Sequence, residues 1–288
     1  MTKADGLVRI TIAYVAALFA GGVALYALDG GPLADAFFAD VIATIVIFMF
    51  SRAYSNSSFY DAYWTVIPPF IALFWLAVGG AEVPPLRNLL VMGVILYWAT
   101  RLTLNWAYHW EGMHHEDWRY QMLREKSPRL ELFTDFFGIH LFPTLQVFAG
   151  LLPVYAVYTL GDQPFGWLDL LACIVGFGSV TVQMIADFQL HAFIRNREEG
   201  QHLDSGLWAW SRHPNYLGEI GFWLSLCLFG LAAYPQGWYW HGIGFVAMTL
   251  MFVFASIPMM EKRSLERRPD YQQVIDRVSM LLPRPPRS

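Results

Sequence analysis

The sequence predicts an all-α polytopic transmembrane helical bundle, and two observations carry this prediction. Hydrophobic residues make up 56% of the 288-residue chain, whereas charged residues make up only 15%. Soluble domains carry about 25% charged residues. The apolar residues are also gathered into long runs, and a run of about 20 is enough for a helix to cross a membrane. The chain is therefore expected to be an integral membrane protein.

Eight such runs follow one another along the chain, which predicts seven to eight spans. The third run contains Pro68 and Pro69, and the fourth contains Arg101, so these two are the least uniform. No linker, repeat or separate soluble segment interrupts the series, and residues 1–288 are expected to form a single integral membrane domain. The predicted spans are 7–28, 36–53, 62–79, 87–109, 135–159, 166–190, 216–234 and 240–259.

The placement of lysine and arginine predicts the orientation of these spans. Basic residues gather in the cytoplasmic connections of membrane proteins. Of the 19 lysines and arginines, all except Arg87 and Arg101 fall near the chain ends or in the connections around 51–61, 110–134 and 191–215. With eight spans, these segments share one side of the membrane. Both termini and the long polar loops are therefore expected to face the cytoplasm.

The stretch SRHPNYLGE, residues 211–219, places several polar side chains directly before the apolar run GFWLSLCLFG. Pro214 suits the first turn of a helix. Asn215 and Glu219 then lie one turn apart on the same helix face, and backbone N–H groups at a helix start favour an anion. The stretch predicts a helix that begins at the cytoplasmic surface with its polar side chains facing inward.

A line of polar side chains also marks the fourth span. Tyr97, Arg101, Asn105 and His109 are spaced four residues apart and share one helix face. An arginine inside a span is costly and usually faces a partner or a water-filled cavity. Its place near the cytoplasmic end also allows the side chain to reach the membrane surface. Four polar groups on one face favour a site.

Acidic residues mark the sixth and third spans. Gln183, Asp187 and His191 share one face of the sixth span, and an acid within a span indicates a functional site. The alternative is a pair between Asp187 and an arginine that locks the bundle. Asp61 stands at the start of the third span. An uncharged carboxylic acid in such apolar surroundings is able to donate a hydrogen bond to a substrate carbonyl, so Asp61 is a candidate for that role. The alternative there is helix capping by Asp61 or by one of the residues 56–58.

The loop at 109–120 is rich in histidine, but its spacing argues against a metal site. No second pair of histidines follows, and Cys173 and Cys227 both lie inside apolar runs. No metal is therefore predicted. The loop is either a solvated surface segment or part of a cofactor site, in which Arg119 and Tyr120 help to hold a charged group, since guanidinium groups match phosphates.

The polar faces of the third, fourth, sixth and seventh spans all lie toward their cytoplasmic halves. The simplest arrangement closes them around one pocket, with apolar walls for a lipid and a basic mouth for a phosphate-bearing cofactor. No glycine-rich dinucleotide fingerprint follows a strand in this sequence. A nucleotide cofactor would therefore be bound within the bundle.

The string GLWAWSRHPNYLGE, the upstream ADFQ and the loop EDWRY together resemble the steroid 5-alpha-reductase superfamily, in particular its bacterial membrane branch. The resemblance covers residues 50–282 and is strongest over 183–222, which leaves 1–50 as extra N-terminal spans. The shorter core RHPxY is shared with isoprenylcysteine carboxyl methyltransferases, so it does not separate the two families.

The resemblance implies a helical membrane bundle that holds NADPH in a cytoplasm-facing cavity and transfers a hydride to the C=C bond of a conjugated enone. The family's acid falls on Asp61, one methylene shorter than the family's glutamate. The family's tyrosine precedes an arginine that matches Arg101, so Trp98 takes its place, with Tyr97 adjacent. Asp61, Tyr97 and Trp98 are the implied catalytic residues.

The resemblance also implies the cofactor contacts. Gln183, Asp187, Asn215 and Glu219 take the places of the nicotinamide and ribose contacts, and arginines of the mouth take those of the phosphate contacts. The excess of arginine there favours NADPH over NADH. The predicted cofactor-binding residues are Arg101, Asn105, Arg119, Tyr120, Gln183, Asp187, Arg195, Arg212, His213, Asn215, Tyr216 and Glu219.

The expected function is thus a membrane-embedded, NADPH-dependent oxidoreductase acting on an enone lipid, in a bacterial inner membrane with its cofactor site facing the cytoplasm. The substrate class stays open among steroids, hopanoids, polyprenols and unsaturated fatty-acid derivatives. Membrane lipids are expected contacts, and nucleic acid is not an expected partner. One alternative is a methyltransferase that uses S-adenosylmethionine on a lipid or isoprenylcysteine. Another is a non-enzymatic transporter or membrane partner subunit.

Overall fold

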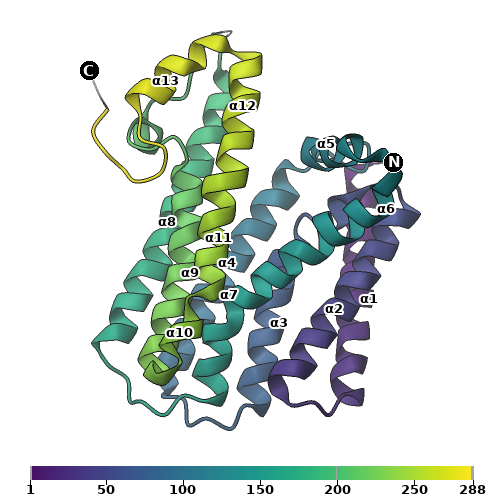
Figure 1. Ribbon diagram of the computed structural model, residues 1–288, viewed down its shortest axis with the longest axis vertical. Coiled ribbons are helices and arrows are strands. Elements are labelled where there is room, and N and C mark those ends of the chain that lie inside the picture. Colours follow the sequence, from purple (N-terminus) through teal and green to yellow (C-terminus); the bar gives the residue numbers. More distant parts are fainter. Residues whose placement is uncertain (1, 199, 287–288) are drawn as a thin grey trace.

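A computed structural model gives the structure over residues 2–198 and 200–286. It is a bundle of antiparallel helices, and no strand occurs within these residues (Figure 1). Eight helical segments are long and apolar enough to cross a membrane. The predicted all-α bundle is confirmed, with eight spans in place of the predicted seven to eight. The protein is an integral membrane protein.

Six spans contain one named helix each, and two are compound. The fifth span, Pro128–Thr159, joins the short α6 to α7 through a π-helical turn at Thr134–Leu141. The eighth, Pro235–Arg267, contains α10, α11 and α12, and a π-helical turn at Phe252–Ser256 joins α11 to α12. The helices are α1 Lys3–Ala27, α2 Pro32–Ala53, α3 Tyr63–Val78, α4 Pro85–His109, α5 Trp118–Lys126, α6 Glu131–Phe133, α7 Phe142–Thr159, α8 Trp167–Asn196, α9 Pro214–Ala233, α10 Trp238–His241, α11 Ile243–Met251, α12 Ile257–Arg267 and α13 Gln272–Arg277.

Local sequence signals explain where several helices begin. The hydroxyl of Thr2 accepts a hydrogen bond from the backbone N–H of Asp5, and the Asp5 carboxylate accepts one from the N–H of Thr2, which is a capping box. α2 follows Gly31, whose positive φ of 91° suits glycine. α9 begins at Pro214, as the sequence predicts.

Both chain ends and alternate connections lie at one end of the bundle. Figure 1 shows the N-terminus, α5, α13 and the C-terminus together at the top of the view, with the α2–α3 and α8–α9 connections. These segments carry most of the lysines and arginines, so we call this the basic end. Their common side agrees with the prediction from charge. That this end faces the cytoplasm stays a prediction.

At the opposite end of the bundle, Arg87 is a basic residue that departs from the charge pattern, and it lies in a buried ion pair. Arg87 of α4 donates from Nε and Nη2 to the two carboxylate oxygens of Asp169 of α8, at 2.7 and 2.8 Å. Its guanidinium also donates to the carbonyls of Gln163 and Pro164. Each of the three guanidinium nitrogens of Arg87 thereby has an acceptor, so a lone basic residue is tolerated at this end.

Small residues allow α9 to lie against α8 at close range. A Cβ atom added at Gly218 would lie 2.6 Å from the carbonyl oxygen of Ser179 and 2.7 Å from Cβ of Gln183. Such close backbone approach is typical of small residues at membrane helix interfaces. It brings the polar faces of the two helices into direct contact near the basic end.

Candidate functional site

A strip of polar side chains runs between α4, α8 and α9 inside the apolar bundle. Arg101 of α4 forms an ion pair with Asp187 of α8 and also donates to the carbonyl oxygen of Gln183 at 2.9 Å. Asn215 of α9 donates to the other carboxylate oxygen of Asp187 at 3.4 Å. The ion pair between Asp187 and an arginine, one of the two explanations of this acid, is confirmed.

Glu219 forms the deep end of this strip, with only 3% of its surface exposed. Its Oε2 accepts hydrogen bonds from Gln183 Nε2 at 2.7 Å and Trp98 Nε1 at 3.0 Å, and its Oε1 accepts one from Trp223 Nε1 at 2.9 Å. These donors come from three helices, and all are uncharged. The carboxyl group of Glu219 therefore fixes α4, α8 and α9 relative to one another.

Two polar atoms of the strip have no protein partner. Within residues 2–198 and 200–286, neither Nη1 of Arg101 nor Oε1 of Gln183 forms a hydrogen bond, although both atoms are buried. Buried polar atoms are nearly always paired. One atom is a donor and the other an acceptor, on two residues that contact each other. A primary amide group has the complementary acceptor and donor.

A cavity of about 320 Å³ continues the strip toward the basic end, and its lining includes Asp61, Asn105, His109, Asp117 and His191. Asn105 lies one turn from Arg101 on α4, and His191 lies one turn from Asp187 on α8. The imidazole rings of His109 and His191 stack with their centroids 3.4 Å apart. The cavity and the polar strip therefore occupy adjacent turns of the same two helices.

Asp61 is one of three acids that line this cavity, with Glu111 and Asp117, and its hydrogen-bond partners come from two other elements. Tyr120 of α5 donates its hydroxyl to Oδ1 of Asp61 at 2.7 Å, and the indole of Trp106 donates to Oδ2 at 3.3 Å. Burial, reinforced by the Asp61 carboxylate, raises the pKa of Tyr120 well above its usual value. Tyr120 is thus a hydrogen-bond donor across the physiological range.

Residue Asp117 begins α5 and fixes Arg119. Its Oδ1 accepts from the backbone N–H and the Nε of Arg119 at 2.8 and 2.9 Å, and its Oδ2 accepts from Nη2 at 2.7 Å. Burial alone would raise the pKa of Asp117, but the hydrogen bonds and charge of Arg119 outweigh it and hold the pKa below its usual value. Arg119 therefore stands beside the cavity in a fixed orientation.

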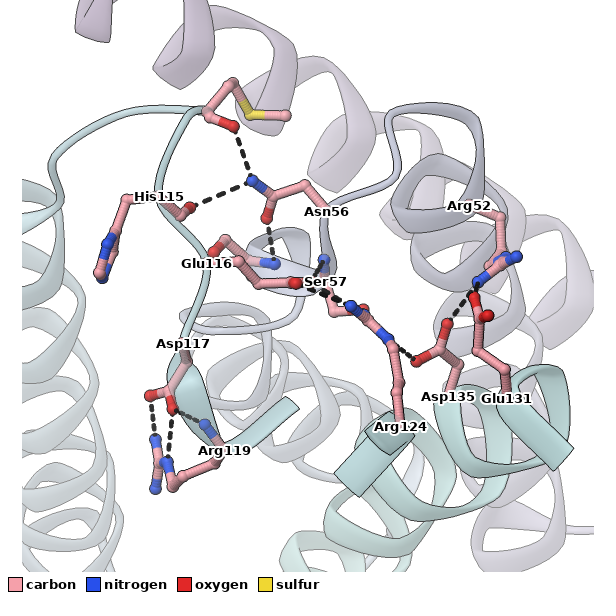
Figure 2. Close-up of polar contacts among 12 residues, drawn as sticks. Arg52, Asn56, Ser57, His115, Glu116, Asp117, Arg119, Arg124, Glu131 and Asp135 are labelled. Atoms are coloured by element: carbon pink, nitrogen blue, oxygen red, sulfur yellow. Dashed lines mark hydrogen bonds and ion pairs between the residues drawn. The ribbon is translucent and has the colours of Figure 1, made fainter. Parts of the chain in front are cut away.

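The loop before α5 is fastened to the α2–α3 connection (Figure 2). Asn56 donates to the carbonyls of Met113 and His115 at 2.9 and 3.1 Å, and the backbone N–H of Ser57 donates to Glu116 at 2.7 Å. Asn56 also accepts from the N–H of Ser58 at 2.8 Å, which confirms the capping explanation for that residue. The loop consequently forms one wall of the cavity.

An arginine joins this loop to the fifth span. Figure 2 shows Arg124 of α5 between Glu116 and Asp135, with distances of 2.7 and 2.6 Å to their carboxylates. Arg52, at the end of α2, also binds Asp135, at 2.6 Å, and Glu131, at 2.9 Å. These ion pairs hold α2, α5, the fifth span and the loop together.

Tyr97 and Trp98, the implied catalytic partners of Asp61, point away from it. Tyr97 contacts α8, where its hydroxyl lies 3.2 Å from that of Thr181. Trp98 is fully buried against Phe222 of α9, with ring centroids 4.3 Å apart. In the structure, Trp98 donates its hydrogen bond to Glu219 and not to a group near Asp61. The phenol that contacts Asp61 is Tyr120.

The arginine and histidine of SRHPNYLGE bind the C-terminal segment. Arg212 binds the carboxylate of Glu261 at 2.7 Å and the carbonyls of Ile275 and Val278 at 3.0 and 2.5 Å. His213 binds the same oxygen of Glu261 at 3.0 Å. These side chains face α12 and the tail, not the cavity.

Two further predicted cofactor residues, Tyr216 and Arg195, lie outside the polar strip and the cavity lining. Tyr216 stacks between His213 and Phe252, with centroids 5.5 and 4.7 Å away. Arg195 is exposed at the end of α8. Trp106 and Trp223 were missed by the sequence analysis, although the position of Trp223, one turn after Glu219, is a signal for it.

No group of three or more histidine, cysteine, aspartate or glutamate side chains suited to a metal occurs in the described part of the chain. The polar strip and the cavity instead offer hydrogen-bond donors and acceptors from α3, α4, α5, α8 and α9. Such convergence of polar groups in an otherwise apolar bundle is typical of a ligand site.

Comparisons with known proteins extend over most of the chain. The uncharacterized protein C594.04c of Schizosaccharomyces pombe is 29% identical over 255 residues, covering 80% of this chain and 73% of the relative. No solved structure matches. A family described as protein of unknown function DUF1295 matches residues 47–278, which include both the polar strip and the cavity. The chain therefore belongs to the DUF1295 family.

Proposed function

We propose that the protein is a membrane-embedded reductase that uses NADPH to reduce the C=C bond of a conjugated enone lipid. The observation that carries the proposal is the pair of unpartnered atoms, Arg101 Nη1 and Gln183 Oε1. They lie in a polar strip that adjoins an acid-containing cavity. The resemblance of GLWAWSRHPNYLGE to steroid 5-alpha-reductases supports the same reaction.

The residues present fit the cofactor. The carboxamide of nicotinamide carries one acceptor and one donor group, which complement Arg101 and Gln183. Arg195, at the basic end, would hold a phosphate. Arg119 binds Asp117 through Nε and Nη2, which leaves its Nη1 to hold a second phosphate, whereas Arg212 is bound by Glu261 and two carbonyls. NADPH, when bound, supplies the hydride, and the protein contributes position and electrostatics.

Asp61 and Tyr120 would orient and polarise the substrate carbonyl. In the structure, the hydroxyl of Tyr120 donates to Oδ1 of Asp61 and the indole N–H of Trp106 donates to Oδ2. In the proposal, the substrate carbonyl accepts the hydroxyl proton of Tyr120 in place of Asp61, and Asp61, in its uncharged form, donates a second hydrogen bond to that carbonyl. Donors aimed at an oxygen stabilise the negative charge that develops on it during reduction. Trp98 has a positioning role in this scheme, because it holds Glu219.

The direct test is ligand-dependent thermal unfolding of the detergent-solubilised protein with NADPH, NADH and S-adenosylmethionine in separate samples. A ligand at 100 times its dissociation constant stabilises by about 2.7 kcal/mol. We expect a shift with NADPH that is lost in Gln183→Leu and retained in Asp162→Ala, a matched change of an exposed residue at the opposite end. A shift with S-adenosylmethionine alone would establish the methyltransferase alternative. No shift with any of the three would overturn the reductase and favour a non-enzymatic role.

A further inference from the structure

A second cavity, of about 490 Å³, lies between α1, α2 and α3 and is separate from the site above. Its lining includes Phe19, Gly22, Asp40, Ile67 and Phe70, of which only Asp40 is polar. Phe19 and Phe70 are 73% and 47% exposed, so the cavity opens sideways onto the apolar surface of the bundle. It is therefore a groove that faces the membrane.

The acid of this groove, Asp40, accepts no hydrogen bond of ordinary geometry within residues 2–198 and 200–286. Asp40 is 2% exposed, and neither of its carboxyl oxygens accepts a hydrogen bond from any described residue. The hydroxyl of Tyr63 lies beside Asp40, but no hydrogen bond of ordinary geometry joins the two, and this hydroxyl is likewise buried without a partner among the described residues. Other buried acids of this chain are paired, as Asp169 is with Arg87. A buried acid without a partner is costly, which indicates a ligand.

The depth of Asp40 restricts the chemistry of that ligand. Asp40 lies about two turns, or roughly 12 Å, from Pro32 at the start of α2. With a hydrocarbon core of about 30 Å, this depth is well inside the membrane, below the charged headgroups. A phosphate would also be repelled by the carboxyl group. The fitting ligand has an apolar body and one uncharged donor group.

We propose that this groove binds a membrane lipid alcohol, whose hydroxyl donates a hydrogen bond to Asp40 while its apolar body lies along α1 and α3. The volume is within the range of pockets that enclose small ligands, roughly 300–1,000 Å³. The groove is formed largely by residues before position 47, outside the matched family region. The inference is independent of the reductase proposal.

The test uses photolabelling of the full chain in detergent micelles with a diazirine derivative of hexadecanol, followed by mapping of the labelled peptides. We expect labelling of α1 and α3 that unlabelled hexadecanol displaces and that its methyl ether displaces roughly tenfold less well, since the ether lacks the donor. Equal competition by the ether, stronger competition by hexadecylamine, or labelling spread over the whole apolar surface would each overturn the assignment.

Glycine positions supply matched variants. A Cβ atom at Gly22 or at Gly178 meets nothing within 4 Å, but only Gly22 lines the groove. Gly22→Leu is therefore expected to abolish labelling by filling the groove, whereas Gly178→Leu, on α8, leaves it unchanged. Loss of labelling in both variants, or in neither, contradicts the proposed site.

Variants of Asp40 distinguish an effect on lipid binding from an effect on the stability of the fold. Asp40→Leu is expected to weaken labelling roughly tenfold while raising the unfolding temperature, because it removes a buried acid without a partner. Asp40→Asn retains an acceptor oxygen and is expected to keep most of the labelling. A lowered unfolding temperature together with unchanged labelling in Asp40→Leu would make Asp40 a structural residue and overturn the proposal.

Discussion

The hydroxyl of Tyr120 donates a 2.7 Å hydrogen bond to the carboxylate of Asp61, although 59 residues separate the two in the sequence. The contact exists because the loop before α5 is held to the α2–α3 connection by Asn56 and Glu116. It joins an acid and a phenol at the wall of one cavity.

Replacement of Tyr120 by phenylalanine tests the assignment of the phenol. Under the proposed function, the variant loses one donor to the developing oxygen charge, and such a loss costs about 10²–10³ in turnover. We expect kcat for enone reduction to fall by about a hundredfold with little change in KM, measured by NADPH oxidation.

Tyr108→Phe is the control for this variant, because Tyr108 is strongly exposed on α4. It should turn over at the wild-type rate. Wild-type turnover in Tyr120→Phe would remove Tyr120 from the chemistry.

The ion pair between Arg101 and Asp187 separates a structural role from a functional one. Arg101→Met leaves the Asp187 carboxylate within the bundle without its charged partner, which is expected to lower the free energy of unfolding by about 3–5 kcal/mol. The double variant Arg101→Met/Asp187→Leu removes both charges and should recover most of that stability. Neither variant should be stabilised by NADPH in thermal unfolding.

The double variant Arg87→Met/Asp169→Leu is the matched control, since it removes the buried pair at the opposite end. Stabilisation by NADPH should persist there. If NADPH still stabilises the Arg101→Met/Asp187→Leu protein, the pair only locks the bundle.

Arg212 is expected to act as a clamp on the C-terminal segment. Arg212→Ala removes hydrogen bonds to Glu261, Ile275 and Val278, and each hydrogen bond to a charged group contributes about 1.5–3 kcal/mol. Hydrogen–deuterium exchange in residues 272–284 should therefore become more than tenfold faster.

Arg195→Ala should leave this exchange unchanged, because Arg195 is exposed at the end of α8. Unchanged exchange in Arg212→Ala, combined with lost NADPH stabilisation, would instead assign Arg212 to the cofactor phosphates.

The pair of Asp117 and Arg119 predicts a dependence of stability on pH. The pKa of Asp117 in the folded protein is lower than its ordinary value of 3.8. Asp117 therefore contributes stability above that pH and loses its contribution as the pH falls through the folded-state pKa. In thermal unfolding, Asp117→Asn should be less stable than wild type at pH 7. The difference should begin to shrink below about pH 4 and vanish below the folded-state pKa of Asp117.

Asp204→Asn, an exposed change at the same end of the bundle, should follow the wild-type curve throughout. A constant difference between Asp117→Asn and wild type at every pH would show that the carboxylate charge is irrelevant.

The spans were predictable because length and apolarity alone define a membrane helix. Their ends were less so. The eighth span was expected over 240–259 but continues to Arg267, since Ile257–Arg267 is amphipathic and leaves the apolar region as a continuous helix. Hydrophobicity marks where the membrane ends, whereas helical hydrogen bonding continues beyond it.

The residues that share one helix face were predictable because spacing along the chain alone decides it. The contacts between different helices were not predictable in this way. The spacing of Asn215 and Glu219 fixes their common face, and both indeed face α8. Whether Tyr97 or Trp98 faces the site depends on the rotation of α4 about its axis. That rotation is set by the packing of Trp98 on Phe222, which no local spacing encodes.

The contacts of Arg212 with the segment after the eighth span bear on the order in which the protein is assembled during synthesis. The carbonyl oxygens that hold Arg212 belong to Ile275, Val278 and Ser279, which follow the eighth span and therefore leave the ribosome after it. All eight spans are thus inserted before the loop ahead of α9 acquires its partners. A chain that ends before Ile275 would enter the membrane with Arg212 lacking its backbone partners at the basic end, a signature that quality-control proteases are suited to detect.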